Sequence, residues 1–126
     1  MLLQVVIFKM LSYYGYKKCS TSSKAEKFLK NHKINYQFID ITVSPPSKED
    51  LIKIIEFSGK PIGKFFNTSG VVYREMKLKD KLKAMSEDEK IDLLASNGKL
   101  LKRPIVYNGK ISTVGFNENE FTDSWS

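Results

Sequence analysis

The segment LSYYGYKKCSTSSKAEKFLKNHKINYQFIDI, residues 11–41, holds the pattern that decides the fold. Residues 11–16 are rich in aromatic side chains and are followed by lysines, which predicts a β-strand. From residue 22 to about residue 32, Ala25, Phe28 and Leu29 recur at helical spacing. The alternation in NYQFIDI, residues 35–41, predicts a second strand. A strand, a helix and a strand in this order normally form a parallel pair with a right-handed crossover.

The length and composition describe one soluble globular domain. The 126 residues are 41% hydrophobic and 28% charged, and a chain of this size can build a core without disulfide bonds. Its single cysteine, Cys19, cannot form an internal disulfide, which fits a reducing cytosol and predicts a cytoplasmic protein.

The N-terminal run MLLQVVIF is apolar but far shorter than the roughly 20 residues of a membrane helix. It has no basic region before it and no cleavage site of small residues after it, so neither a signal peptide nor membrane association is expected. Because Met10 stands directly before the first strand, residues 1–9 are predicted to be an upstream extension and residues 10–126 a single domain.

The formal charge is +7, from 19 lysines, two arginines and 14 acidic residues. Such an excess favours acidic partners through long-range attraction. The lysines alternate with acidic residues and never form a block of five or six, which is typical of a solvated surface. Direct binding of nucleic acid is therefore not predicted.

The middle of the chain, about residues 47–98, is predicted to be a helical insert. Ser47 can cap a helix that Gly59 ends. Residues 62–66 and 78–82 form short helical turns, and Ser86 with Glu89 makes a capping box for a helix that ends at Asn97 and Gly98.

The last third, RPIVYNGKISTVGF, predicts a β-hairpin. Asn108-Gly109 between two β-rich runs is a strong turn signal, so strands at 104–107 and 110–114 should pair antiparallel. The tail can add a short helix with Trp125 packed on the body. Together these elements predict an α/β protein with a thioredoxin-like, mixed four-stranded sheet and flanking helices.

Cys19 would then follow the first strand and precede the first helix. The helix dipole stabilises a thiolate there and lowers its pKa below the usual value of roughly 8.5, and Lys17 and Lys18 act in the same direction. Hydroxyl groups that can donate to the sulfur or to a bound oxyanion follow at Ser20, Thr21 and Ser22. The alternative is a buried, unreactive cysteine, since free cysteines are among the most buried residues.

Seven motifs occur in a fixed order: KKCSTSSKA, PPSKEDL, FFNTSG, YRE, MSEDEKIDLL, KRPIV and TVGF. With them the chain resembles the arsenate reductase (ArsC)/Spx family over residues 10–125. The resemblance implies a cis peptide bond before Pro104 and an anion site formed by Arg103 and Pro104 beside the active thiol. One branch of the family reduces arsenate with glutathione and glutaredoxin, and the Spx branch binds RNA polymerase and senses thiol oxidation.

The chain departs from both branches. Arsenate reductases carry C-x-T-S-R at the thiol, where this chain has Ser23 in place of the arginine. Of their three anion-binding arginines only Arg103 is present, because Asn67 stands at the second position and the third is missing. Two arginines cannot supply three bidentate forks, so arsenate is not the favoured substrate. Ser22 replaces the second cysteine of the Spx C-x-x-C motif, so no intramolecular disulfide can form.

Two hypotheses follow from the resemblance. In the first, the protein is a monothiol oxidoreductase in which Cys19 attacks a small oxidised or anionic substrate. Glutathione or another low-molecular-weight thiol is then the co-substrate and reductant, with no bound cofactor and no metal. In the second, the protein is a Spx-like regulator that binds RNA polymerase without a C-x-x-C switch.

Overall fold

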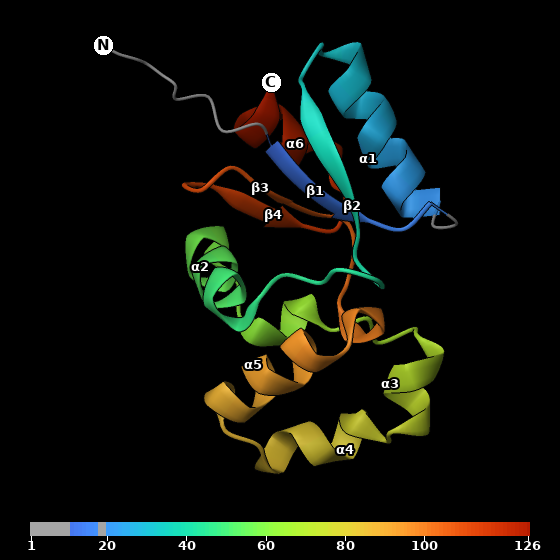
Figure 1. Ribbon diagram of the computed structural model, residues 1–126, viewed down its shortest axis with the longest axis vertical. Coiled ribbons are helices and arrows are strands. Elements are labelled where there is room, and N and C mark those ends of the chain that lie inside the picture. The colour runs from blue at the N-terminus through green and yellow to red at the C-terminus, as the bar shows by residue number, and fades with distance from the viewer. Residues whose placement is uncertain (1–10, 18–19) are drawn as a thin grey trace.

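The computed structural model describes residues 11–17 and 20–126 (Figure 1). The predicted extension at residues 1–9 lies outside this part of the chain, as do Met10, Lys18 and Cys19. A four-stranded mixed sheet forms the centre, with the order β2-β1-β3-β4. Its strands are β1 (Leu11–Gly15), β2 (Tyr36–Asp40), β3 (Ile105–Tyr107) and β4 (Ser112–Val114).

The first two strands pair in parallel, whereas β3 pairs antiparallel with both β1 and β4. The predicted parallel pairing of the first two strands and the predicted thioredoxin-like sheet are therefore confirmed. The helices of the described chain are α1 (Ser20–Asn31), α2 (Lys48–Ser58), α3 (Val71–Glu75), α4 (Leu78–Lys81), α5 (Glu87–Ser96) and α6 (Glu118–Trp125), with short 3-10 turns η2 (Ile62–Phe65), η3 (Leu82–Ala84) and η4 (Gly98–Leu100).

Helices α1 and α6 cover one face of the sheet (Figure 1). Tyr13 of β1 and Val106 of β3 point to this side, because alternate strand residues face opposite sides of a sheet. They pack with Phe28 and Leu29 of α1 and with Phe121 of α6 into one buried cluster. Ala25, Phe28 and Leu29, which the sequence places at helical spacing, are thus the apolar residues that α1 buries against the sheet.

The other face carries the helical insert, and α2 lies directly against β4. Tyr14 of β1 and Ile105 of β3 face this side of the sheet. They pack here with Leu51 and Ile54 of α2. The Ser112 hydroxyl donates a 2.5 Å hydrogen bond to the Ile54 carbonyl oxygen, which ties the insert to the sheet. The larger of the two core clusters therefore lies between sheet and insert.

The predicted helix caps are confirmed. The Ser47 hydroxyl accepts a hydrogen bond from the Asp50 amide, and Gly59 ends α2 in the left-handed region at φ 69°. Ser86 and Glu89 form the complete capping box of α5. Each cap depends on residues within one turn of chain, and this is why the sequence alone was sufficient to predict it.

The hairpin differs from the prediction in its loop. Tyr107 pairs with Ser112, so four residues separate the strands instead of two. The Asn108 side-chain oxygen accepts hydrogen bonds from the amides of Lys110 and Ile111. These local hydrogen bonds close a wider loop than the Asn-Gly signal predicts. Strand β4 therefore begins at Ser112, two residues after the predicted start at residue 110.

Two further differences lie in the helices. Helix α1 begins at Ser20, two residues before the predicted start, and α3 at Val71–Glu75 was not predicted at all. A helix of five residues is too short to show a recognisable period. No helix of the described chain is long and apolar enough to cross a membrane.

Candidate functional site

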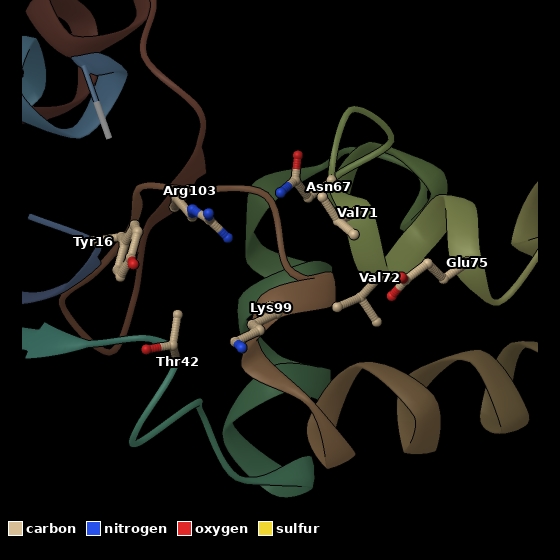
Figure 2. Close-up of a pocket in the computed structure, with 9 residues that line it drawn as sticks. Tyr16, Thr42, Asn67, Val71, Val72, Glu75, Lys99 and Arg103 are labelled. Atoms are coloured by element: carbon tan, nitrogen blue, oxygen red, sulfur yellow. The ribbon is translucent and has the colours of Figure 1, made fainter. Parts of the chain in front are cut away.

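A pocket of about 360 Å³ lies where the helical insert meets the ends of the two parallel strands (Figure 2). Tyr16 and Thr42 enter it from the chain just beyond β1 and β2. In open α/β sheets, ligands commonly bind outside these carboxyl ends. The lining residues are Tyr16, Thr42, Asn67, Gly70, Val71, Val72, Glu75, Lys99 and Arg103.

Arg103 is the arginine that lines this pocket. It precedes Pro104 in a cis peptide bond, as predicted. Its guanidinium carbon lies 5.1 Å from the centre of the Tyr16 ring, in a cation–π contact. The Nη1 atom is buried and has no hydrogen-bond partner among the described residues. Leaving a buried donor unpaired costs about 1–3 kcal/mol, so this atom is poised for an acceptor on a ligand.

Thr42 lines the pocket on the same side as Tyr16, and Asp40 holds it in place from the end of β2. The Thr42 hydroxyl and amide donate to one Asp40 carboxylate oxygen, at 2.7 Å and 2.9 Å. These hydrogen bonds, the hydroxyl first, hold the pKa of Asp40 below its ordinary value, and the charge of Arg103 adds to the effect. The ionised carboxylate therefore orients Thr42 at the edge of the pocket.

Cys19, the predicted nucleophile, lies outside the described residues. Helix α1 begins at the next residue, Ser20. The Ser22 side chain is buried: its oxygen lies 2.9 Å from the Tyr13 hydroxyl and accepts a 3.3 Å hydrogen bond from the Tyr16 amide. Thr21 is half-buried. That Ser20, Thr21 and Ser22 contact an anion stays a prediction.

The structure adds residues to the site that sequence reasoning missed. Asn67 was aligned with a missing arginine, and it does line the pocket beside Arg103. Lys99 of η4 and Glu75 of α3 were not assigned to the site, because nothing in the local sequence gives Lys99 a role and the YRE motif gives none to Glu75. They line the same pocket as Arg103 because the helical insert packs against the sheet.

The mixed four-stranded sheet with its flanking helices defines a thioredoxin-like protein of the ArsC type. The sequence model of the ArsC family matches residues 14–124, and the chain belongs to the ArsC family.

Three relatives illustrate its range. The uncharacterized protein YusI of Bacillus subtilis (strain 168) is 50% identical over 116 residues, 92% of this chain and 98% of that protein. The global transcriptional regulator Spx of Streptococcus pyogenes serotype M3 is 32% identical over 111 residues, 88% of this chain and 81% of Spx. The crystal structure of a possible arsenate reductase from Streptococcus mutans UA159 has a TM-score of 0.83 and 41% identity, covering 91% of this chain and 98% of that one.

Proposed function

We propose that this protein is a thiol-dependent reductase in which Cys19 is the nucleophile and an external thiol is the reductant. The observation that carries the proposal is the unpaired, buried Nη1 of Arg103, held against Tyr16 at the rim of a pocket. A guanidinium with free donors binds carboxylate and other oxyanions strongly. The similarity to a possible arsenate reductase supports the same class of chemistry.

The proposed reaction is a thiol–disulfide exchange. The Cys19 thiolate attacks one sulfur of a small disulfide, forms a mixed disulfide with it and releases the other sulfur as a thiolate. A second thiol, glutathione or a similar small molecule, then attacks the mixed disulfide. It regenerates the Cys19 thiolate and leaves as part of a new disulfide. The chain has one cysteine, so the second thiol must come from outside.

The first test is the pH dependence of alkylation by iodoacetamide. Because Cys19 is the only cysteine, the rate reports on this thiol alone. We expect an apparent pKa below the roughly 8.5 of a free thiol. A value at or above that figure, with slow labelling, would exclude a reactive site.

The second test uses the two arginines of the chain. Arg103→Gln should lower kcat/KM for reduction of a carboxylate-bearing disulfide by at least about tenfold, because charged hydrogen bonds contribute roughly 1.5–3 kcal/mol. Arg74 is the matched control: it is exposed, it donates to the Ser69 carbonyl oxygen and it does not line the pocket. Equal losses in Arg103→Gln and Arg74→Gln would contradict the assignment.

A second candidate is a regulator that docks on RNA polymerase. The 32% identity with the global transcriptional regulator Spx favours it. Such docking requires no thiol chemistry, so the Cys19→Ser variant should still capture RNA polymerase in a pulldown. Loss of reductase turnover in Cys19→Ser without any polymerase capture would favour the reductase.

A further inference from the structure

Strand β2 forms one edge of the sheet, and within the described chain no strand pairs with its outer side (Figure 1). The Ile41 amide, just past β2, donates a 2.9 Å hydrogen bond to the Gly15 carbonyl oxygen of β1. Alternate residues of a strand turn their N–H and C=O groups to opposite sides, so those of Tyr36 and Phe38 point away from β1. An edge of this kind is a template for a further strand.

A groove of about 510 Å³ lies beside this edge, and we call it the α1–β2 groove. Its lining residues are Glu26, Lys30, Lys33, Ile34, Asn35, Tyr36 and Phe38. Ile34, Tyr36 and Phe38 are partly buried against the core, so they give the groove an apolar floor. A strand edge beside a groove with side-chain pockets is the geometry that binds extended peptides by β-strand addition. The groove shares no lining residue with the pocket of Arg103.

The rim of the groove is basic. Lys30 and Lys33 are exposed, and among the described residues neither has an ion-pair partner. Lys17 is also exposed, and its Nζ atom lies 4.9 Å from the centre of the Phe38 ring. Three ammonium groups thus border the same strand edge.

The one carboxylate among the lining residues belongs to Glu26, and it accepts a 2.7 Å hydrogen bond from the Tyr36 hydroxyl. The surplus of positive charge attracts an acidic occupant. It also opposes a second copy of this chain, because pairing β2 with β2 would bring like charges together, and lysines at a sheet edge are a known device against such pairing.

Lys33 stands at a backbone position where glycine is usual. Its φ is 57°, in the left-handed region. Its amide donates to the Lys30 carbonyl oxygen at 3.0 Å, and the Ile34 amide donates to the Leu29 carbonyl oxygen at 2.9 Å. These two hydrogen bonds end α1 in a Schellman motif, whose left-handed residue is most often glycine because a Cβ atom is disfavoured there. A lysine at this position therefore keeps a charge beside the groove at a cost in helix stability.

We propose that the α1–β2 groove binds an extended, acidic segment of a partner protein by β-strand addition. The segment pairs with the outward N–H and C=O groups of Tyr36 and Phe38. Every second side chain of the segment faces the groove, where apolar groups lie on Ile34 and acidic groups contact Lys30 and Lys33. The five residues of β2 offer roughly 17 Å of edge at about 3.3 Å per residue.

The first test pans a displayed library of random octapeptides against the full chain. We expect enrichment of sequences that alternate acidic and apolar residues, and micromolar binding of the synthetic consensus peptide in fluorescence polarisation. Methylation of its backbone nitrogens, one at a time, should abolish binding at every second position, because only alternate amides face β2. No enrichment, or a methylation pattern without this period of two, would overturn the proposal.

The second test examines the basic rim with the same consensus peptide. Lys30→Gln and Lys33→Gln should each weaken binding by up to about fivefold, the range of exposed ion pairs. The loss should shrink near 1 M salt, where the Debye length is ~3 Å. Lys83→Gln is the matched control, because Lys83 is an exposed residue of η3 that does not line the groove. Equal losses in all three variants would contradict a role of the rim.

Lys33→Gly separates binding from folding. Glycine relieves the left-handed backbone, so the urea midpoint should rise, while the lost charge should weaken peptide binding as in Lys33→Gln. A purely structural role of Lys33 would leave peptide binding unchanged in both variants, and that result would refute its role in binding. Sedimentation measurements address the other occupant: a dimer that excludes the peptide would assign the edge to a second copy and overturn the proposal.

Discussion

Gly98→Ala is expected to destabilise the fold strongly, because Gly98 touches backbone from a distant part of the chain. A Cβ atom there would lie 1.7 Å from the carbonyl oxygen of Ile41 and 2.7 Å from its carbonyl carbon. Gly98 is not in the left-handed region, so close approach, and not backbone conformation, requires the glycine.

The loss of stability in Gly98→Ala can be gauged from how far the backbone around Gly98 and Ile41 must move. An ordinary contact needs about 3.5 Å, so the Cβ atom and the Ile41 carbonyl oxygen must separate by roughly 1.8 Å. Ile41 is fully buried and cannot yield without disturbing the core. Overpacking of this kind costs about 1–3 kcal/mol and sometimes more. We expect about 3 kcal/mol, which corresponds to a fall in Tm of roughly 10 °C.

Urea unfolding followed by circular dichroism measures the change, with Gly63→Ala as the control. A Cβ at Gly63 would meet nothing within 4 Å and φ there is not in the left-handed region, so this variant should match or slightly exceed the wild type. Gly98→Ala should also weaken ligand binding, since Thr42 adjoins Ile41 and lines the pocket. A Gly98→Ala protein within about 1 kcal/mol of the wild type would refute the reasoning, since overpacking costs at least that much.

Three further predictions concern side-chain hydrogen bonds. Thr113→Val should lower the stability by about 1–3 kcal/mol, because it leaves the buried Trp125 Nε1 donor without its 3.0 Å partner. Fluorescence of the single tryptophan follows unfolding, and an unchanged unfolding midpoint would contradict this prediction. Ser112→Ala should cost about 1 kcal/mol in urea unfolding by removing the link between β4 and α2, and a gain in stability would count against that link. Hydrogen bonds from the Ser86 amide and hydroxyl hold the pKa of Glu89 below its ordinary value of 4.5. Stability from the Glu89 carboxylate is therefore complete above that value and is lost as pH falls through the lower pKa of the folded state. The wild type should exceed Glu89→Gln in urea stability at neutral pH and converge with it on acidification; a constant difference would exclude this linkage.

The same division between local and distant contacts explains which features could be predicted. The core face of α1, the Ser47 and Ser86 caps and the glycine after α2 depend on neighbours within a few residues, and all were predicted correctly. The hairpin was predicted, but its four-residue loop is an exception to this division, because the Asn108 hydrogen bonds that widen it are local and the Asn-Gly signal did not reveal them. Arg103 and Asn67 were reached only through a resemblance to a family.

The sequence by itself determined the order and type of the main elements, since periodicity and capping are properties of short stretches of chain. The pocket was decided only by the tertiary structure. Its lining comes from the ends of two strands, from the insert and from the turn before Pro104, and these segments meet because Leu51, Ile54 and their neighbours pack the insert against the sheet. No local pattern places Glu75 or Lys99 in the same pocket as Arg103, because the apolar core that brings these residues together lies elsewhere in the chain.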